Sequence, residues 1–215
     1  MGQQYFAGRP DARSDEGTVR VRLPDLDLEL TTDRGVFAGR RLDAGTDTLL
    51  RRGEQIVPDS VVLDLGCGYG PIAVVLARRN PDAVVWAVDV NERARDLCAR
   101  NTRDIGLANV WVAAPDDVPD DVRFAAIWSN PPIRIGKVAL HALLLRWLAR
   151  LTPGGTAHLV VHKHLGSDSL ARWLAEQGFT VVRRASHQGY RLLDVRPPPQ
   201  RLTANYSGFV ADPGN

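Results

Sequence analysis

Two short segments of the sequence carry residue types that suit chemistry on a small ligand. In the first, Asp64-Leu-Gly-Cys-Gly-Tyr-Gly70, glycines recur at alternate positions directly after an apolar run. Glycines at such a place let the backbone turn sharply and approach a ligand closely. In the second, Ser129-Asn-Pro-Pro-Ile133, two successive prolines force an extended, rigid turn beside a polar side chain. The first pattern predicts a ligand-binding turn, and the second predicts a fixed hydrogen-bonding group.

An acidic residue, Asp89, supports a nucleoside site at the glycine segment. It ends the next apolar run, about 20 residues further on, where a carboxylate can accept from both ribose hydroxyls. A dinucleotide and S-adenosylmethionine both fit this pattern. Asp64 and the Gly-x-Gly-x-Gly spacing favour S-adenosylmethionine, because a carboxylate before the glycines repels a pyrophosphate. The same carboxylate can hold the ammonium end of methionine, directly or through water.

The proline segment suits chemistry on an amine. Because Pro131 and Pro132 have no N–H, we expect the Asn130 side-chain oxygen and the Pro131 carbonyl to be free to accept both hydrogens of a planar amine. The nitrogen of a base or an amide is a poor nucleophile, since its lone pair is delocalised. Two acceptors can pyramidalise it and aim the lone pair at a sulfonium methyl. We therefore predict that Asn130, Pro131 and Pro132 form a catalytic segment for methyl transfer.

Ten residues are predicted to bind the cofactor: Asp64, Gly66, Cys67, Gly68, Tyr69, Gly70, Asp89, Val90, Asp116 and Asn130. Two of them have an alternative interpretation. Asp116 is placed to accept from an adenine amine, or it belongs to a solvated acidic loop. Tyr69 packs at the cofactor's edge, or it belongs to the core.

Elements of alternating type must position both segments. We expect strands over 61–65, 84–90, 110–113, 124–129 and 157–162, helices over 71–79, 92–105, 138–151 and 167–177, and a closing pair of strands over 180–185 and 190–195. The alternation predicts a doubly wound parallel α/β sheet with helices on both faces, and the closing pair predicts an antiparallel edge. Both segments follow a strand, and ligands bind at the carboxyl ends of the strands in such sheets.

With these two segments and this order of elements, the chain resembles a class I S-adenosylmethionine-dependent methyltransferase. More narrowly, it resembles the "methyltransferase small" family, which includes single-domain 16S ribosomal RNA guanine-N2 methyltransferases. The matching pieces are residues 35–37, 42–46, 62–72, 88–93 and 129–137. The resemblance implies a Rossmann-like sheet of seven strands, S-adenosylmethionine as the methyl donor and residues 130–133 as the catalytic segment.

The resemblance also implies a substrate side of the pocket. Its predicted residues are Phe37, Gly45, Thr46, Ile133, Arg134 and Lys137. The chain departs from the family at Ile133, where many relatives have an aromatic residue that stacks on the target base, worth roughly 1–3 kcal/mol. Arg134 is a candidate to supply the flat face instead. Larger members also carry a second domain, so we expect an intact small ribosomal subunit to provide the missing contacts.

The predicted domain organisation has four parts. They are an N-terminal arm over 1–17, a hairpin and helix extension over 18–55, the methyltransferase domain over 56–196 and a C-terminal tail over 197–215. Within the extension, strands over 19–23 and 26–31 form the hairpin, because they alternate apolar and polar residues around a Pro-Asp turn.

Composition limits the remaining possibilities. The net charge is only +2, and apolar and charged residues make up 44% and 24% of the 215 residues, an ordinary globular mix. No apolar run of membrane-spanning length is present in the sequence, and we expect no signal peptide, so we expect a cytoplasmic protein with no membrane partner. Two cysteines are too few for a disulfide framework. His162 and His164 lack a third metal ligand nearby, so we expect no metal but a solvent-facing or substrate-side pair at a strand end beside the ligand cleft. We expect a monomer, although the sequence does not fix the oligomeric state.

The expected function is N-methylation of an exocyclic amine, with guanine N2 of 16S ribosomal RNA as the preferred substrate and ribosomal RNA or the small subunit as the partner. Methylation of a protein glutamine amide or of adenine N6 is the alternative, because similar Asn-Pro-Pro segments serve those amines. Two other classes stay open: a catalytically silent module that binds RNA or protein, and a nicotinamide oxidoreductase. Intact Asp64, Asp89 and Asn130 argue against the silent module.

Overall fold

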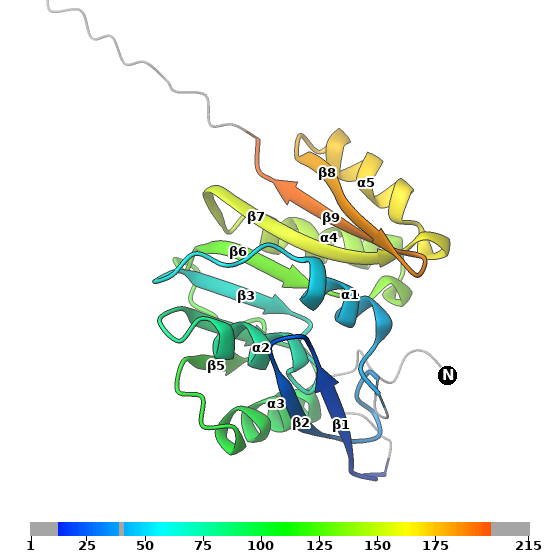
Figure 1. Ribbon diagram of the computed structural model, residues 1–215. Helices are drawn as coiled ribbons and strands as arrows, with labels where there is room; N and C mark the ends of the chain where they lie inside the picture. Colours follow the sequence, from blue (N-terminus) through cyan, green and yellow to red (C-terminus); the bar gives the residue numbers. More distant parts are fainter. Residues whose placement is uncertain (1–12, 39–40, 199–215) are drawn as a thin grey trace, which may run out of the picture.

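The computed structural model describes residues 13–38 and 41–198 of the chain. A seven-stranded sheet with the order β5-β4-β3-β6-β7-β9-β8 forms its centre (Figure 1). The strands are β3 (Val61–Leu65), β4 (Val84–Val88), β5 (Val110–Ala113), β6 (Phe124–Ser129), β7 (Leu151–His162), β8 (Thr180–His187) and β9 (Tyr190–Arg196). Pairs from β5 to β7 are parallel, while β9 runs antiparallel to both β7 and β8. The predicted sheet with its antiparallel edge is confirmed.

Helices cover both faces of the sheet. α1 (Ala44–Arg52), α2 (Pro71–Arg79) and α3 (Glu92–Asp104) pack into one hydrophobic core, and α4 (Lys137–Leu148) and α5 (Ser167–Glu176) pack into the other. Neighbouring strand residues divide between the two cores, as Val62 and Leu63 of β3 show. Successive side chains of a strand point to opposite faces, so a strand buried on both faces reads as a continuous apolar run.

The predicted N-terminal hairpin forms a separate two-stranded sheet of β1 (Gly17–Arg22) and β2 (Asp27–Thr32). Its buried side chains Val19, Val21 and Leu30 join the core that contains α3. The Asn101 side chain of α3 both donates to and accepts from the backbone of Thr31. The hairpin is therefore fixed against α3 by its apolar face and by a paired amide.

The prediction was wrong about the boundary between α4 and β7. The helix expected over 138–151 ends at Leu148, and the strand that follows begins at Leu151. Leu151 pairs with Phe124 of β6, which buries its side chain in the sheet. Residues 153–155 do not stop a helix; they lie where the register of β7 against β6 shifts. Long-range pairing with β6 outweighed the local helical pattern.

Residues 1–12 of the predicted arm and 199–215 of the predicted tail lie outside the described residues, and Gly17, the last residue of the arm, belongs to β1. In the described part, no helix is long and apolar enough to cross a membrane. The same ranges contain no group of three or more His, Cys, Asp or Glu side chains arranged to hold a metal ion.

Candidate active site

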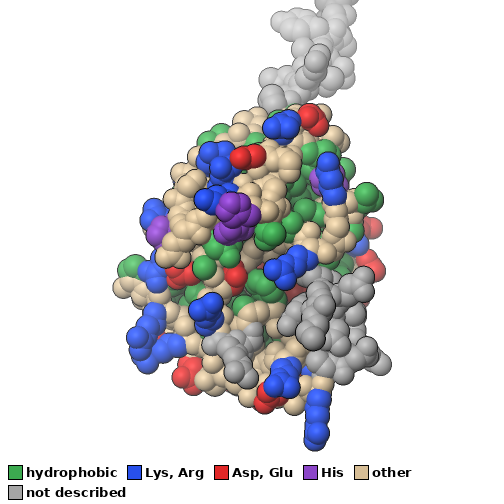
Figure 2. Space-filling model, turned by 90° about the vertical axis from the view of Figure 1, so that its right-hand side faces the viewer, with side chains coloured by type: hydrophobic (Ala, Val, Ile, Leu, Met, Phe, Trp, Pro, Cys, Tyr) green, Lys and Arg blue, Asp and Glu red, His purple; other side chains and the backbone are tan. Residues whose placement is uncertain are grey.

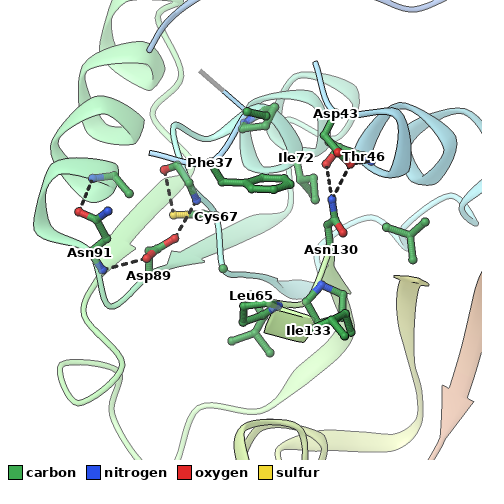
Figure 3. A pocket seen from close by; sticks show the side chains of 18 of the residues that line it. Phe37, Asp43, Thr46, Leu65, Cys67, Ile72, Asp89, Asn91, Asn130 and Ile133 are labelled. Carbon is green, nitrogen blue, oxygen red and sulfur yellow. Dashed lines mark hydrogen bonds between the residues drawn. The ribbon is translucent and has the colours of Figure 1, made fainter. Parts of the chain in front are cut away.

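A cavity of about 440 Å³ opens at the carboxyl ends of the parallel strands (Figure 3). Thirteen of the predicted site residues line it: Phe37, Thr46, Gly66, Cys67, Gly68, Tyr69, Asp89, Val90, Asn130, Pro131, Pro132, Ile133 and Arg134. They come from loops far apart in the sequence. Figure 2 faces this edge of the molecule and shows apolar side chains in the middle, with Lys and Arg side chains spread around them.

Five predicted residues lie outside the cavity wall: Asp64, Gly70, Gly45, Asp116 and Lys137. Lys137 is exposed at the start of α4. The Asp116 side chain is 87% exposed and forms an ion pair with Arg146, 2.8 Å between Nη2 and Oδ1. Of the two interpretations of Asp116, the solvated loop therefore describes its surroundings here, and a contact with adenine stays a prediction.

The glycine turn after β3 has the backbone shape that its sequence predicts. Gly66 and Gly68 have φ angles of 78° and 57°, in the left-handed region that favours glycine. The N–H groups of Gly66 and Cys67 both donate to the Val88 carbonyl at the end of β4. The turn is thus held open against the neighbouring strand, with its backbone at the cavity.

Asp89 connects this turn to the next helix. Its Oδ2 accepts from the Gly68 N–H at 2.9 Å, and its Oδ1 accepts from the Asn91 N–H at 2.8 Å. Burial raises the pKa of Asp89, although both N–H groups lower it. Each carboxylate oxygen has a further lone pair and Asp89 lines the cavity, which fits the predicted ribose hydroxyls.

Asp64 is fully buried behind the turn. Its Oδ2 accepts from the Ala73 N–H at 2.9 Å and so caps the first turn of α2, which has no side-chain cap of its own. Burial, helped by the nearby Asp89 charge, raises the pKa of Asp64 to about 8. Within the described part of the chain, no hydrogen-bond partner reaches Oδ1. An orphaned buried oxygen fits a polar ligand group or water at that side, so contact with the methionine ammonium stays a prediction.

Gly70 and the two cysteines make a tight contact beneath the cavity. Gly70 has a φ of 92°, and a Cβ atom there would lie 2.7 Å from the Cys98 Sγ. Cys67 and Cys98 are free and buried, and a hydrogen bond between their thiols together with burial raises the pKa of Cys67. Gly70 therefore lets α2 approach α3 and does not line the cofactor cavity.

The Asn130 side chain is oriented by the start of α1 (Figure 3). Its Nδ2 donates to Asp43 Oδ2 at 2.7 Å and to Thr46 Oγ1 at 3.2 Å. A carboxylate only accepts hydrogen bonds, so the NH₂ group must be the end that faces Asp43. Within the described residues, no donor reaches the amide oxygen, so it is available as an acceptor, and its role toward an amine stays a prediction.

The prediction that the Pro131 carbonyl is free was wrong. This oxygen accepts from the Ile133 N–H at 2.8 Å, because the chain turns immediately into the short 3-10 helix η2 (Ile133–Ile135). A carbonyl oxygen has two lone pairs, so one remains for a ligand. Local turn formation after the prolines was not visible in the residue types.

A covering segment over residues 35–38 lies at the cavity, which Val36, Phe37 and Ala38 line. Phe37 is 49% exposed and extends across the pocket on the side of Asn130 (Figure 3). The Asn91 side chain, which caps α3, donates to the Gly35 carbonyl at 2.9 Å. This contact ties the covering segment to the loop that carries Asp89.

Tyr69 is buried in the core cluster and also lines the cavity, and its packing at the cofactor's edge stays a prediction. The predicted site omitted four polar or aromatic residues that line the cavity: Asp43, Asn91, His162 and Tyr190. Asp43 directly precedes α1, and an Asp in that position is a recognisable N-cap signal. The positions of His162 and Tyr190 depend on strand pairing, which residue types did not reveal.

Comparisons with known proteins agree on the family. The model of the methyltransferase small domain matches residues 27–194. The protein YbxB of Bacillus subtilis is 33% identical over 199 residues, which cover 91% of this chain and 99% of that protein. Ribosomal RNA small subunit methyltransferase C of Shewanella amazonensis is 32% identical over 189 residues, 86% of this chain and 54% of that protein.

A solved structure shares the fold. It is a T. thermophilus 16S rRNA N2 G1207 methyltransferase in complex with AdoMet and guanosine, with a TM-score of 0.70 and 24% identity over 87% of this chain and 52% of that one. The chain thus spans about half the length of the ribosomal RNA methyltransferases that it matches.

The doubly wound sheet, the glycine turn and the cavity at the strand ends define a class I S-adenosylmethionine-dependent methyltransferase. The chain belongs to the methyltransferase small domain family. The predictions of the family, the fold class and the cofactor are confirmed.

Proposed function

We propose that this protein methylates the exocyclic N2 amine of a guanine in 16S ribosomal RNA. The observation that carries the proposal is the Asn130 side chain, whose oxygen is left as an acceptor in the cavity because its nitrogen is held by Asp43 and Thr46. Matched relatives are named for methylating small-subunit or large-subunit ribosomal RNA, and the structural neighbour is named for guanine N2. These names support the choice of RNA and of the amine.

S-adenosylmethionine, when bound, supplies an electrophilic methyl group on a positively charged sulfur. Asp89 accepts from the ribose hydroxyls, and the glycine turn lets the nucleoside lie against the backbone. Asn130 Oδ1 and the second lone pair of the Pro131 carbonyl accept the two hydrogens of the acceptor amine. This would position the nitrogen lone pair for attack on the methyl carbon, whose bond to sulfur breaks so that S-adenosylhomocysteine leaves. The two acceptors would also stabilise the positive charge that develops on the nitrogen. The amine then releases one proton to solvent, so no strong general base is required.

The test uses purified protein, S-adenosylmethionine labelled in the methyl group and acceptors from cells that lack this gene. Separate reactions receive small ribosomal subunits, large subunits, naked 16S RNA and total protein, and the labelled nucleosides and amino acids are separated. Asn130→Ala is the catalytic control. Val138→Ala is the matched control, because Val138 is exposed on α4 away from the cavity wall.

Label in N2-methylguanosine that Asn130→Ala loses and Val138→Ala keeps supports the proposal. The better of the two small-subunit substrates shows whether contacts from the assembled subunit replace the extra length of the larger relatives. Label in N6-methyladenosine or methylglutamine shows that the acceptor is one of the alternative amines and not guanine N2. Cofactor binding without label in any acceptor overturns the proposal in favour of a silent binding module.

A further inference from the structure

Two aromatic side chains that the proposed reaction has not used face each other in the cavity. His162 ends β7, Tyr190 begins β9, and the two residues are partners across the antiparallel ladder. Their ring centroids lie 4.9 Å apart with the planes at 80°, and both rings line the cavity. The pair therefore forms a corner of two perpendicular aromatic surfaces in the wall.

Two glycines make room for these rings. A Cβ atom on Gly45 would lie 2.7 Å from Tyr190 Cε1, and a Cβ atom on Gly189 would lie 2.7 Å from His162 Nε2. A Cβ atom does not approach another heavy atom this closely, so any other residue at either position would displace the ring. Gly45, predicted as a pocket residue, thus acts on the pocket through the Tyr190 ring and not by lining it.

The ring corner adjoins the amine acceptor. Gly45, which contacts the Tyr190 ring, donates its backbone N–H to Asp43 Oδ2 at 2.8 Å. The same oxygen holds the Asn130 amide. Burial, with the Asp43 carboxylate, raises the pKa of Tyr190, so the ring stays neutral at physiological pH. A group that reaches Asn130 Oδ1 therefore lies beside a neutral aromatic wall.

The geometry points to the His162–Tyr190 pair as the stacking platform for the acceptor base, an inference that rests on the proposed function. Residue 133 is isoleucine and offers apolar contact without a π face. Base–aromatic stacking changes affinity by roughly tenfold to a hundredfold. A stacking platform elsewhere in the cavity therefore compensates for the missing aromatic ring at residue 133. A flat heteroaromatic ring gains binding free energy by stacking in such a corner, whereas a glutamine amide has no ring to stack. The acceptor class that fits the pair is an unpaired nucleobase.

One test measures stacking without methyl transfer. The probe is a short single-stranded RNA that carries 2-aminopurine, whose C2 amine matches that of guanine and whose fluorescence is quenched on stacking. It is titrated into protein saturated with S-adenosylhomocysteine. We expect quenching by wild type and by Tyr190→Phe, and at least tenfold weaker binding with Tyr190→Leu and His162→Leu. Affinity for S-adenosylhomocysteine and the melting temperature show that each variant is folded.

Steady-state methylation of the natural acceptor gives the second readout. We expect Tyr190→Leu to lower kcat/KM for RNA by tenfold to a hundredfold, and Tyr190→Phe to stay within about threefold of wild type. Equal loss in Phe and Leu variants, unchanged quenching in both Leu variants, or no quenching by wild type overturns the platform. If the quenching results are as expected but the protein methylates no RNA, the stacking platform is supported and the proposed function is rejected.

Discussion

The amide nitrogen of Asn130 lies 2.7 Å from a carboxylate oxygen of Asp43, a residue 87 positions earlier in the chain. Asp43 caps α1 with the same oxygen, which also accepts from the N–H groups of Gly45 and Thr46. One side chain therefore closes the helix and fixes which end of the Asn130 amide faces the cavity. The helix that covers the pocket is thereby coupled to the catalytic segment.

We expect Asp43→Ser to lower kcat by tenfold to a hundredfold with little change in cofactor affinity. Serine is as good an N-cap as aspartate, so α1 keeps its cap, but the charged hydrogen bond to Asn130 is lost. A hydrogen bond to a charged group contributes about 1.5–3 kcal/mol, which corresponds to this range in rate. Single-turnover methylation and calorimetric titration of S-adenosylhomocysteine measure the two effects.

The matched control is Asp47→Ser, which removes an acidic residue of the same helix that pairs with Arg51 and not with Asn130. It should retain wild-type kcat. An Asp43→Ser enzyme with normal kcat, or one whose loss is explained by a lower melting temperature, would contradict the positioning role.

Asp64 gives the protein a pH-dependent stability. Its pKa is about 8 in the folded protein and 3.8 in an unperturbed chain, so the folded state binds the proton more tightly. The stability from this proton is complete below pH 3.8 and is lost as pH rises towards 8, by at most about 1.4 kcal/mol per pH unit. We expect the free energy of unfolding to fall from pH 5 to 8 relative to Asp64→Asn, which keeps an oxygen for the Ala73 N–H. Urea titrations at each pH measure the free energy of unfolding of both proteins. If the two free energies change with pH in parallel, the predicted effect of Asp64 is refuted.

Two glycine substitutions should separate packing from cofactor binding. Gly70→Ala places a Cβ against Cys98 and strains a φ of 92°, so we expect a loss of about 1–3 kcal/mol in stability. Gly66→Ala has a φ of 78°, but nothing lies within 4 Å of its Cβ, and Gly66 lines the cavity. We expect it to be less destabilising and to reduce cofactor affinity more. Thermal melts and calorimetric titration measure both quantities, and the reverse order would contradict the assignment.

Asp89→Asn should weaken S-adenosylhomocysteine binding by tenfold to a hundredfold. An amide cannot accept from both Gly68 and Asn91, so the variant also leaves one N–H without its partner. Asp116→Asn is the comparison, since its exposed side chain pairs with Arg146 outside the cavity wall. We expect it to bind within threefold of wild type. A tenfold loss in Asp116→Asn would instead support the predicted contact with adenine.

Sequence patterns were sufficient for the fold class, the family and thirteen of the residues that line the cavity. The turn around Gly66 and Gly68 and the rigid segment at Asn130 depend on local backbone rules, which residue types express directly. Their convergence follows from the rule that parallel strands present their carboxyl ends at one edge. The two-residue alternation likewise predicted the N-terminal hairpin.

Tertiary structure decided which polar atoms are used. The Ile133 N–H takes one lone pair of the Pro131 carbonyl, and Asp43 takes the Asn130 nitrogen, because the chain brings these groups together only after folding. The order of the strands likewise decided where the Tyr190 side chain lies. Since β9 inserts antiparallel between β7 and β8, Tyr190 at its beginning reaches the edge where β7 ends. Local residue types do not encode such long-range pairing, so the aromatic wall of the pocket appears only in three dimensions.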